Sequence, residues 1–231
     1  MFDFLDRIRN YFKDSPDLKF IAEQLRKPSG DFAGDIGSKM NIVNEPLFDL
    51  TLDTMQPGPG ENILEIGSGT GKYIDRILTA SDNLRVWAVD HSSEMIRTIR
   101  QNNWDAIDSG QLEVELARSD DLPFPDASFD KVFCNMVVYF WDDPEPHLSE
   151  VQRVLTEDGI FYTGVRTRES MLAFPFVEHG FTLYTIDAWK EILHEQGFGN
   201  IEVHSRRDPA MDIDGNQISL ESCCLAAVKE A

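Results

Sequence analysis

The chain has 231 residues, of which 42% are hydrophobic and 27% charged, a composition typical of a folded protein and not of a disordered one. This length suits one large domain with room for a small cap, and it does not favour two independent domains. The 41 acidic and 21 basic residues give a net charge of -20, which repels phosphate backbones and anionic lipid. Because the sequence contains no clear basic patch, we expect neither nucleic acid nor a membrane as partner.

Cysteine usage and the amino terminus both predict a cytoplasmic protein. The three cysteines, Cys134, Cys223 and Cys224, do not form a disulfide framework and are expected to be buried thiols in a reducing compartment. Their spacing does not resemble a zinc site, so no metal is expected. The first ten residues lack the features of a signal peptide, and no segment approaches the roughly 20 apolar residues of a membrane span.

The first 60 residues differ from the rest of the chain. Their apolar residues recur at helical spacing in two segments, and a third segment closer to the sheet also reads as a helix: residues 2–12, 17–25 and 47–55. We expect a glycine-containing loop over 28–37, and the GPG sequence at 58–60 closes the region. The pattern predicts an N-terminal helical lid or cap over residues 1–60 and a main domain over residues 61–231.

From residue 62 onward, short runs rich in β-branched residues alternate with helical patterns, which predicts a parallel sheet with covering helices. The expected strands are residues 62–67, 84–90, 112–118, 129–138, 159–166, 201–205 and 222–228. The expected helices are residues 71–80, 93–102, 147–155 and 187–196. Asp143 followed by Pro144 is typical of an N-cap and a first helical residue, so the third of these helices is expected to begin there.

The strongest local signal is ILEIGSGTGKY at residues 63–73, in which an apolar strand runs into Gly67, Gly69 and Gly71. Glycines suit such a turn because it needs unusual dihedral angles, and because a cofactor can approach the backbone only where no Cβ intervenes. A phosphate-binding P-loop needs Ser or Thr after the lysine, and tyrosine follows here. The dinucleotide fingerprint needs a glycine where Lys72 stands. Both of those sites are therefore disfavoured.

The loop resembles motif I of the class I S-adenosylmethionine-dependent methyltransferases, in which an acidic residue precedes the glycines, as Glu65 does here. Asp90 ends the next expected strand, where that family places a carboxylate for the ribose hydroxyls. Residues 119–141 resemble the family's adenine-side loop and fourth strand, and residues 148–164 resemble the helix, turn and strand that follow. The resemblance covers residues 62–164, and in this core the sequence is similar to the ubiquinone- and menaquinone-biosynthesis enzymes.

This resemblance implies an α/β fold: a Rossmann-like, seven-stranded, mostly parallel sheet with helices on both faces and an antiparallel last strand. It implies that residues 61–231 bind S-adenosylmethionine, transfer its methyl group to a small-molecule substrate and release S-adenosylhomocysteine.

The resemblance also implies, position by position, which residues contact the cofactor. The implied contacts are Gly67, Ser68, Gly69 and Gly71 beneath the methionine and ribose, Glu65 and Asn135 at the amino group, Asp90 at the ribose, His91 and Met95 beside the adenine, and Ser119 and Asp120 at its edge. Relatives often have Gly-Asp-Ala where this chain has Ala117, Arg118 and Ser119. The adenine amino group is therefore expected to use Asp120 or to lack its usual acceptor.

An aromatic cluster, Tyr139, Phe140 and Trp141, ends the expected fourth strand, and ligands of parallel α/β sheets bind at the carboxyl ends of strands. These rings either wall a substrate pocket or cap the core. Tyr139 is the candidate catalytic contact near the methyl group, with Trp141 beside the substrate. Arg166, at the end of the fifth strand, is the candidate for an anionic substrate group. The N-terminal helices and residues 167–184 are expected to cover the acceptor.

The alternative functions include a non-catalytic sensor or scaffold that keeps the cofactor site, a nucleotide-cofactor dehydrogenase, and a nucleic-acid methyltransferase. The tetrapeptide NMVV at 135–138 is unlike the NPPY type that holds a flipped base, which argues against the last. Transfer from a sulfonium depends on positioning and a dry pocket, so no fixed triad is required and the use of a general base stays open. His147, His194 and His204 fall on expected helices or an outer strand and receive no role.

Overall fold

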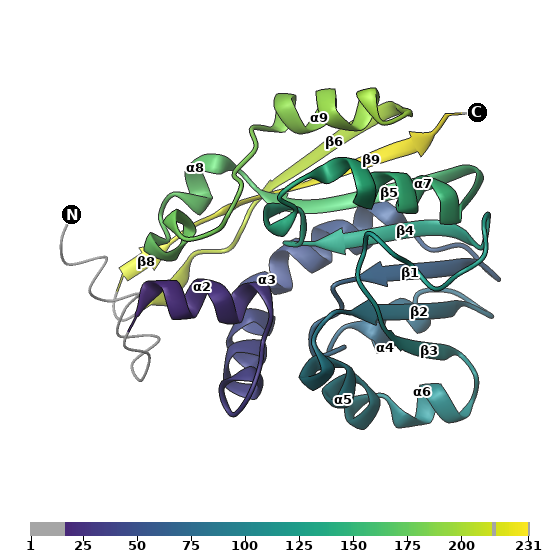
Figure 1. Cartoon of the computed structure of the whole chain (residues 1–231), viewed down its shortest axis with the longest axis horizontal. Helices are drawn as coiled ribbons and strands as arrows, with labels where there is room; N and C mark the ends of the chain where they lie inside the picture. Colours follow the sequence, from purple (N-terminus) through teal and green to yellow (C-terminus); the bar gives the residue numbers. More distant parts are fainter. Residues whose placement is uncertain (1–16, 214–215, 231) are drawn as a thin grey trace.

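Seven strands form one sheet in the order β3-β2-β1-β4-β5-β9-β6 in the computed structural model, which describes residues 17–213 and 216–230 (Figure 1). The strands are β1 Asn62–Ile66, β2 Arg85–Asp90, β3 Leu112–Leu116, β4 Phe129–Asn135, β5 Leu155–Arg166, β6 Phe198–Arg207 and β9 Glu221–Lys229. β1 to β5 run parallel, and β9 is antiparallel to both β5 and β6. This confirms the predicted sheet with its antiparallel last strand.

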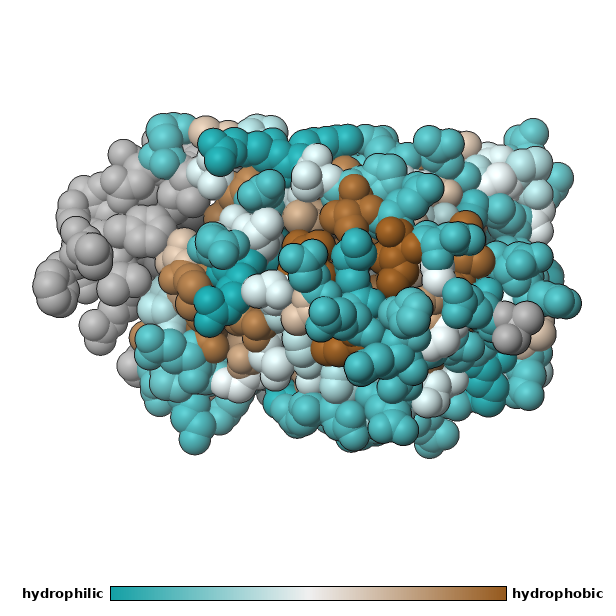
Figure 2. All heavy atoms as spheres, turned by 90° about the horizontal axis from the view of Figure 1, so that it is seen from above, coloured by the Kyte–Doolittle hydropathy of each residue, from teal (hydrophilic) through white to brown (hydrophobic). Residues whose placement is uncertain are grey.

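Helices cover both faces of the sheet. One hydrophobic cluster packs Phe48, Ile77 and Ile99 against Phe133, and the other packs Val151 with strand residues of the opposite face. The first face carries α3 Phe32–Met55, α4 Ile74–Leu78, α5 Ser93–Asn102 and α6 Trp104–Asp108, and the second carries α7 Pro144–Val154 and α9 Ile186–Glu195. Seen from above, the surface is largely hydrophilic, with hydrophobic residues gathered near its middle (Figure 2).

The remaining short elements lie at or near the carboxyl ends of the parallel strands. They are α2 Leu18–Arg26, the 3-10 turns η1 Val138–Phe140 and η2 Pro175–Glu178, α8 Arg168–Met171, and a small antiparallel hairpin of β7 Met211–Ile213 and β8 Asn216–Ile218 that the sequence did not predict. Figure 1 shows α2 and the start of α3 beyond the arrowheads of β1 and β4. The helix expected over residues 2–12 lies outside the described residues. None of the described helices is long and apolar enough to cross a membrane.

Local signals set several helix starts as expected. Asp143 caps α7, and its side chain accepts a hydrogen bond from the backbone N–H of Glu145 (3.2 Å), with Pro144 as the first helical residue. This pairing stabilises the helix start because a carboxylate satisfies a free N–H and proline has none to satisfy. Asp17 caps α2 in the same way.

The loop expected over residues 28–37 is wrong from residue 32 onward, because α3 already begins at Phe32 and runs for 24 residues. Each interior glycine costs a helix about 1 kcal/mol relative to alanine, which is why the sequence suggested a loop. Packing against the rest of the protein offsets this cost. A Cβ added at Gly37 would lie 2.6 Å from Cγ2 of Thr70. A glycine there lets α3 pass close to the glycine loop, and the buried Ile36 and Val43 anchor the helix on either side.

The expected fourth strand is also too long, since β4 ends at Asn135 and not at residue 138. Met136 adopts a left-handed backbone with φ of 61°, which breaks the strand and starts the η1 turn. The residues expected at a strand tip therefore sit on a turn that bends over the sheet edge.

Two glycines of α3 offer a matched test of this packing. Among the described residues, no atom lies within 4 Å of a Cβ added at Gly34, whereas a Cβ at Gly37 would lie 2.6 Å from Cγ2 of Thr70. Gly34→Ala should raise the free energy of unfolding by about 0.5 to 1 kcal/mol, because alanine restricts the unfolded chain. Gly37→Ala should show no such gain in urea unfolding. Equal stabilisation by both would contradict the close approach of α3 to Thr70.

Candidate active site

A cavity of about 480 Å³ lies at the carboxyl ends of β1, β2 and β4, within the size range of small-molecule sites. It brings together most of the residues predicted from the sequence: Glu65, Gly67, Ser68, Gly69, Asp90, His91, Met95, Ser119, Asp120, Asn135, Trp141 and Arg166. Gly71 and Tyr139 are the two predicted site residues that do not line it. Among the described residues, no group of three His, Cys, Asp or Glu side chains could hold a metal ion.

The glycine loop turns the chain away from β1 with a left-handed backbone. Gly67 has φ of 74°, and an added Cβ would lie 2.5 Å from Cγ2 of Val137. Gly71 has φ of 67°, and its Cβ would lie 2.8 Å from Nδ2 of Asn103. Val137 and Asn103 therefore leave no room for a side chain at Gly67 and Gly71, whereas no described atom lies within 4 Å of an added Cβ at Gly69, whose backbone stays open toward the cavity.

Asp90 joins the end of β2 to the glycine loop. Its Oδ2 accepts a hydrogen bond from the N–H of Gly69 (3.0 Å), and its Oδ1 accepts one from the N–H of Ser92 (2.8 Å). Burial raises the pKa of Asp90 to about 6, and these two backbone hydrogen bonds oppose the rise. The carboxylate lines the cavity and has acceptor capacity left for two vicinal hydroxyls.

Two buried polar atoms at the other side of the loop lack partners. Burial raises the pKa of Glu65 to about 8, and its Oε2 has no hydrogen-bond partner in the described structure. The amide of Asn135 accepts a hydrogen bond from Thr51 (2.8 Å), and its Nδ2 is also unpartnered. Because both residues line the cavity, they fit a ligand that brings a cation and further polar groups to this point, as the amino-acid end of S-adenosylmethionine would.

Ser119, Trp141 and His147 form a polar cluster on the β3 side of the cavity. The indole N–H of Trp141 donates to Oγ of Ser119 (3.1 Å), and Oγ lies 2.8 Å from Nδ1 of His147. The Trp141 and His147 rings stack at 4.7 Å. Burial lowers the pKa of His147, which favours a neutral ring. Nδ1 of a neutral ring can accept a hydrogen bond from the hydroxyl of Ser119. Trp141, expected beside the substrate, thus supports the predicted adenine contact Ser119.

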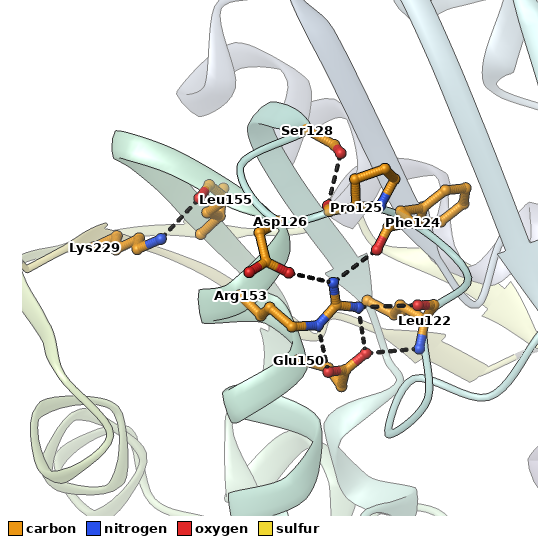
Figure 3. Close-up of polar contacts among 9 residues, drawn as sticks. All are labelled: Leu122, Phe124, Pro125, Asp126, Ser128, Glu150, Arg153, Leu155 and Lys229. Atoms are coloured by element: carbon orange, nitrogen blue, oxygen red, sulfur yellow. Dashed lines mark hydrogen bonds and ion pairs between the residues drawn. The ribbon is translucent and has the colours of Figure 1, made fainter.

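The loop that carries Ser119 and Asp120 is fastened by Arg153 of α7 (Figure 3). Its guanidinium donates to the carbonyl oxygens of Leu122 (2.9 Å) and Phe124 (2.7 Å) and pairs with Asp126 (2.9 Å). It also pairs with both carboxylate oxygens of Glu150, at 2.7 Å each, and that carboxylate accepts from the N–H of Leu122 (2.8 Å). Arg153 therefore fixes the backbone path of residues 122–126.

The structure does not bring Tyr139, the candidate catalytic residue, to the cavity. Its hydroxyl donates to the carbonyl oxygen of Arg166 (2.9 Å) and accepts from the N–H of the same residue (2.7 Å). Burial raises the pKa of this hydroxyl. The sequence predicts Tyr139 at a strand tip, but the η1 turn directs its side chain to Arg166 at the end of β5. These two hydrogen bonds join the turn to the strand.

Arg166 is the candidate contact for an anionic substrate group, and the structure buries its side chain completely. The guanidinium forms an ion pair with the equally buried Asp208 and donates to the carbonyl oxygen of Val43 (2.6 Å). The group thus joins β5 to α3, and a substrate anion would have to reach a guanidinium that is fully buried and already paired with Asp208.

Helix α3 contributes site residues that sequence reasoning missed. The amide of Asn41 exchanges hydrogen bonds with the hydroxyl of Thr70 (2.9 and 3.1 Å), and Thr51 contacts Asn135. Asn44 also lines the cavity, and its Oδ1 is buried without a partner in the described structure. Asn41, Asn44 and Thr51 recur at helical spacing, and this spacing of polar residues was the available signal.

The family model described as "Methyltransferase domain" matches residues 64–163. An O-methyltransferase of Aspergillus nomiae is 30% identical over 156 residues, which cover 64% of this chain and 69% of the relative. The chain spans between 49% and 69% of the length of four of the curated relatives that it matches.

Two solved structures show the same fold. The partner of the Trm112 methyltransferase activator in a Haloferax volcanii complex has a TM-score of 0.71 and 22% identity, and the match covers 87% of this chain and 96% of that one. A Haemonchus contortus phosphoethanolamine N-methyltransferase, solved with S-adenosylhomocysteine, has a TM-score of 0.66 and 14% identity, over 88% of this chain and 62% of that one.

Arg153→Ala should lower the free energy of unfolding by about 1 to 3 kcal/mol, because the carbonyl oxygens of Leu122 and Phe124 and the Glu150 carboxylate lose their donor. Urea unfolding measures this effect. Arg97→Ala, which removes an exposed arginine on α5, is the control and should change stability by less than about 0.5 kcal/mol. A similar small effect for both variants would show that Arg153 does not hold the loop.

Proposed function

This chain belongs to the class I S-adenosylmethionine-dependent methyltransferases, and we propose that it transfers the methyl group of that cofactor to a small molecule. When bound, S-adenosylmethionine supplies a methyl group on a sulfonium, so that the acceptor's lone pair forms the new bond and the sulfur–carbon electron pair stays on sulfur. One observation carries the proposal: Oε2 of Glu65 and Nδ2 of Asn135 are buried without a partner among the described residues, and both side chains line the cavity next to the glycine loop.

The side chains of this chain would bind and orient the cofactor. We propose Glu65 and Asn135 at the amino-acid end, Asp90 at the ribose, His91 and Met95 beside the adenine, Ser119 and Asp120 at its edge, and Gly67, Ser68 and Gly69 beneath the methionine and ribose, with Gly71 shaping the loop. Arg118 pairs with Asp120 (2.5 Å), lowers the pKa of that carboxyl and keeps it charged as an acceptor.

The finer points of function are proposals as well. The Aspergillus nomiae relative is an O-methyltransferase, which supports oxygen as the acceptor atom. We propose that α2, the first half of α3 and residues 167–184 cover the acceptor as a lid, within a division of the chain into residues 1–60 and 61–231. Likeness to the ubiquinone and menaquinone enzymes within the family, and a cytoplasmic location, are proposed on the sequence and on three buried free cysteines.

Isothermal titration calorimetry with S-adenosylhomocysteine tests the cofactor site. We expect binding at micromolar concentration, and failure to bind would refute the proposed function. Formation of S-adenosylhomocysteine from S-adenosylmethionine in the presence of candidate acceptors would then distinguish an enzyme from a sensor that only binds the cofactor. Tight binding of a nicotinamide dinucleotide in its place would favour a dehydrogenase, which the family does not support.

Asp90→Ala should weaken binding of S-adenosylhomocysteine by about 1 to 3 kcal/mol, since the ribose would lose a hydrogen-bond acceptor and Gly69 would lose its partner. Glu115→Ala, on the exposed side of edge strand β3, provides the matched control and should bind like the unaltered protein. Unchanged affinity of Asp90→Ala would contradict the assignment of this carboxylate to the ribose.

Cofactor binding should release protons near neutral pH. Because the pKa of Glu65 is about 8 in the free protein, the carboxyl is mostly protonated at pH 7, and an arriving ammonium favours its charged form. Affinity should therefore rise as the pH increases from 7 toward 8. Calorimetry in buffers of different ionisation enthalpy counts the released protons. Glu65→Gln should abolish this release, and equal release by both proteins would place the titrating group elsewhere.

A further inference from the structure

We propose that the end of the cavity farthest from Asp90 is an acceptor subsite for a flat, largely apolar molecule built on an aromatic or conjugated ring. This inference rests on the proposed methyl transfer and names the class of acceptor. It follows from the position, lining, charge pairing and closure of this end of the cavity.

The sheet order places the subsite. Asp90 ends β2 and Asn135 ends β4, which lies on the other side of β1. β5 is the next strand, and the chain leaving it forms α8 and η2. A nucleoside held at Asp90 with its amino-acid end near Asn135 would therefore point its remaining free side toward residues 167–184.

Apolar side chains, several of them rings, line the cavity on this side. Among the described residues they include Met136, Phe140, Met171, Phe174 and Phe181, with Met40 of α3. The ring of Phe181 lies 4.7 Å from that of Phe140 in an edge-on arrangement. Such rings favour a planar ring as their neighbour, and methionine side chains adapt to its outline.

Charged acceptors are disfavoured because the nearby cations are already paired. Arg26 pairs with Asp142 (2.6 Å), and the buried Arg166 pairs with Asp208. A phosphate or carboxylate in this subsite would have to break such a pair or remain buried without a partner, and both cost energy. Lys72 also lines the cavity, but it is exposed and belongs to the glycine loop.

Helix α2 covers the subsite. The guanidinium of Arg26, the last residue of α2, donates to the carbonyl oxygen of Phe140 (2.9 Å) as well as to Asp142. α2 also packs against η2. An acceptor held beneath α2 is shielded from water, which favours apolar over strongly hydrated molecules.

The test measures binding of two probes to the full chain saturated with S-adenosylhomocysteine. We expect 2-naphthol, a planar ring with one hydroxyl, to bind at least about tenfold more tightly than phosphoethanolamine, a small charged amine. If S-adenosylhomocysteine binds but phosphoethanolamine is preferred, or neither probe binds, the acceptor class is overturned and the proposed function stands. If S-adenosylhomocysteine itself does not bind, the proposed function fails first.

Two adjacent residues provide a matched pair of variants. Met171 is 1% exposed and lines the cavity, whereas its neighbour Leu172 is 54% exposed. Met171→Lys should weaken 2-naphthol binding by at least about tenfold, because a lysine charge would enter an apolar site, and Leu172→Lys should leave it unchanged. S-adenosylhomocysteine binding should stay within about twofold in both, because neither residue is among those proposed to hold the cofactor.

Phe181→Ala keeps the inference testable if Met171→Lys fails to fold. This partly buried ring can be removed with less disruption than a core residue, and its loss should weaken 2-naphthol binding while cofactor binding and thermal stability are retained. Unchanged 2-naphthol binding in Phe181→Ala would overturn the subsite.

Discussion

The site depends on one short link, the hydrogen bond from the N–H of Gly69 to the carboxylate of Asp90. Asp90 ends one strand and Gly69 follows its neighbour, so this bond sets the separation of the two segments that would hold a nucleoside. The bond forms only because the backbone at Gly67 turns back with a positive φ, a conformation that costs other residues energy. The carboxylate is at the same time drawn from water, which raises its pKa, and it keeps acceptor capacity for ligand hydroxyls beside its two backbone donors.

Helix α3 connects this site to the rest of the fold. Its first half touches the glycine loop through Asn41 and Gly37, and its second half packs on β5 and β9. The hydroxyl of Thr51, near the C-terminal end of the same helix, donates to the amide oxygen of Asn135. Movement of α3 would therefore change the loop, the strand tip and the helix that covers the acceptor together.

The sheet and the cofactor side of the site could be predicted from the sequence, because both rest on signals that are local in the chain. Apolar runs ending in glycines or a carboxylate mark β1 and β2, and Asp143 with Pro144 marks a helix start. The acceptor side could not be predicted in this way. Nothing in the sequence reveals that Met136 turns left-handed and moves Tyr139 from a strand tip onto a turn, or that Arg166 pairs with Asp208, which lies 42 residues further on.

The buried pair of Arg166 and Asp208 has a consequence for how the protein could be shortened or fused. Three distant stretches meet at this pair: the end of β5, the carbonyl oxygen of Val43 and the turn after β6. Cutting the chain after residue 207 would remove Asp208 together with β9, which lies between β5 and β6 in the sheet, and it would leave the buried guanidinium of Arg166 without its counter-ion. The segment from Asp208 through β9 therefore stabilises both the sheet and the position of α3. A tag or partner domain is better attached after this segment than in its place.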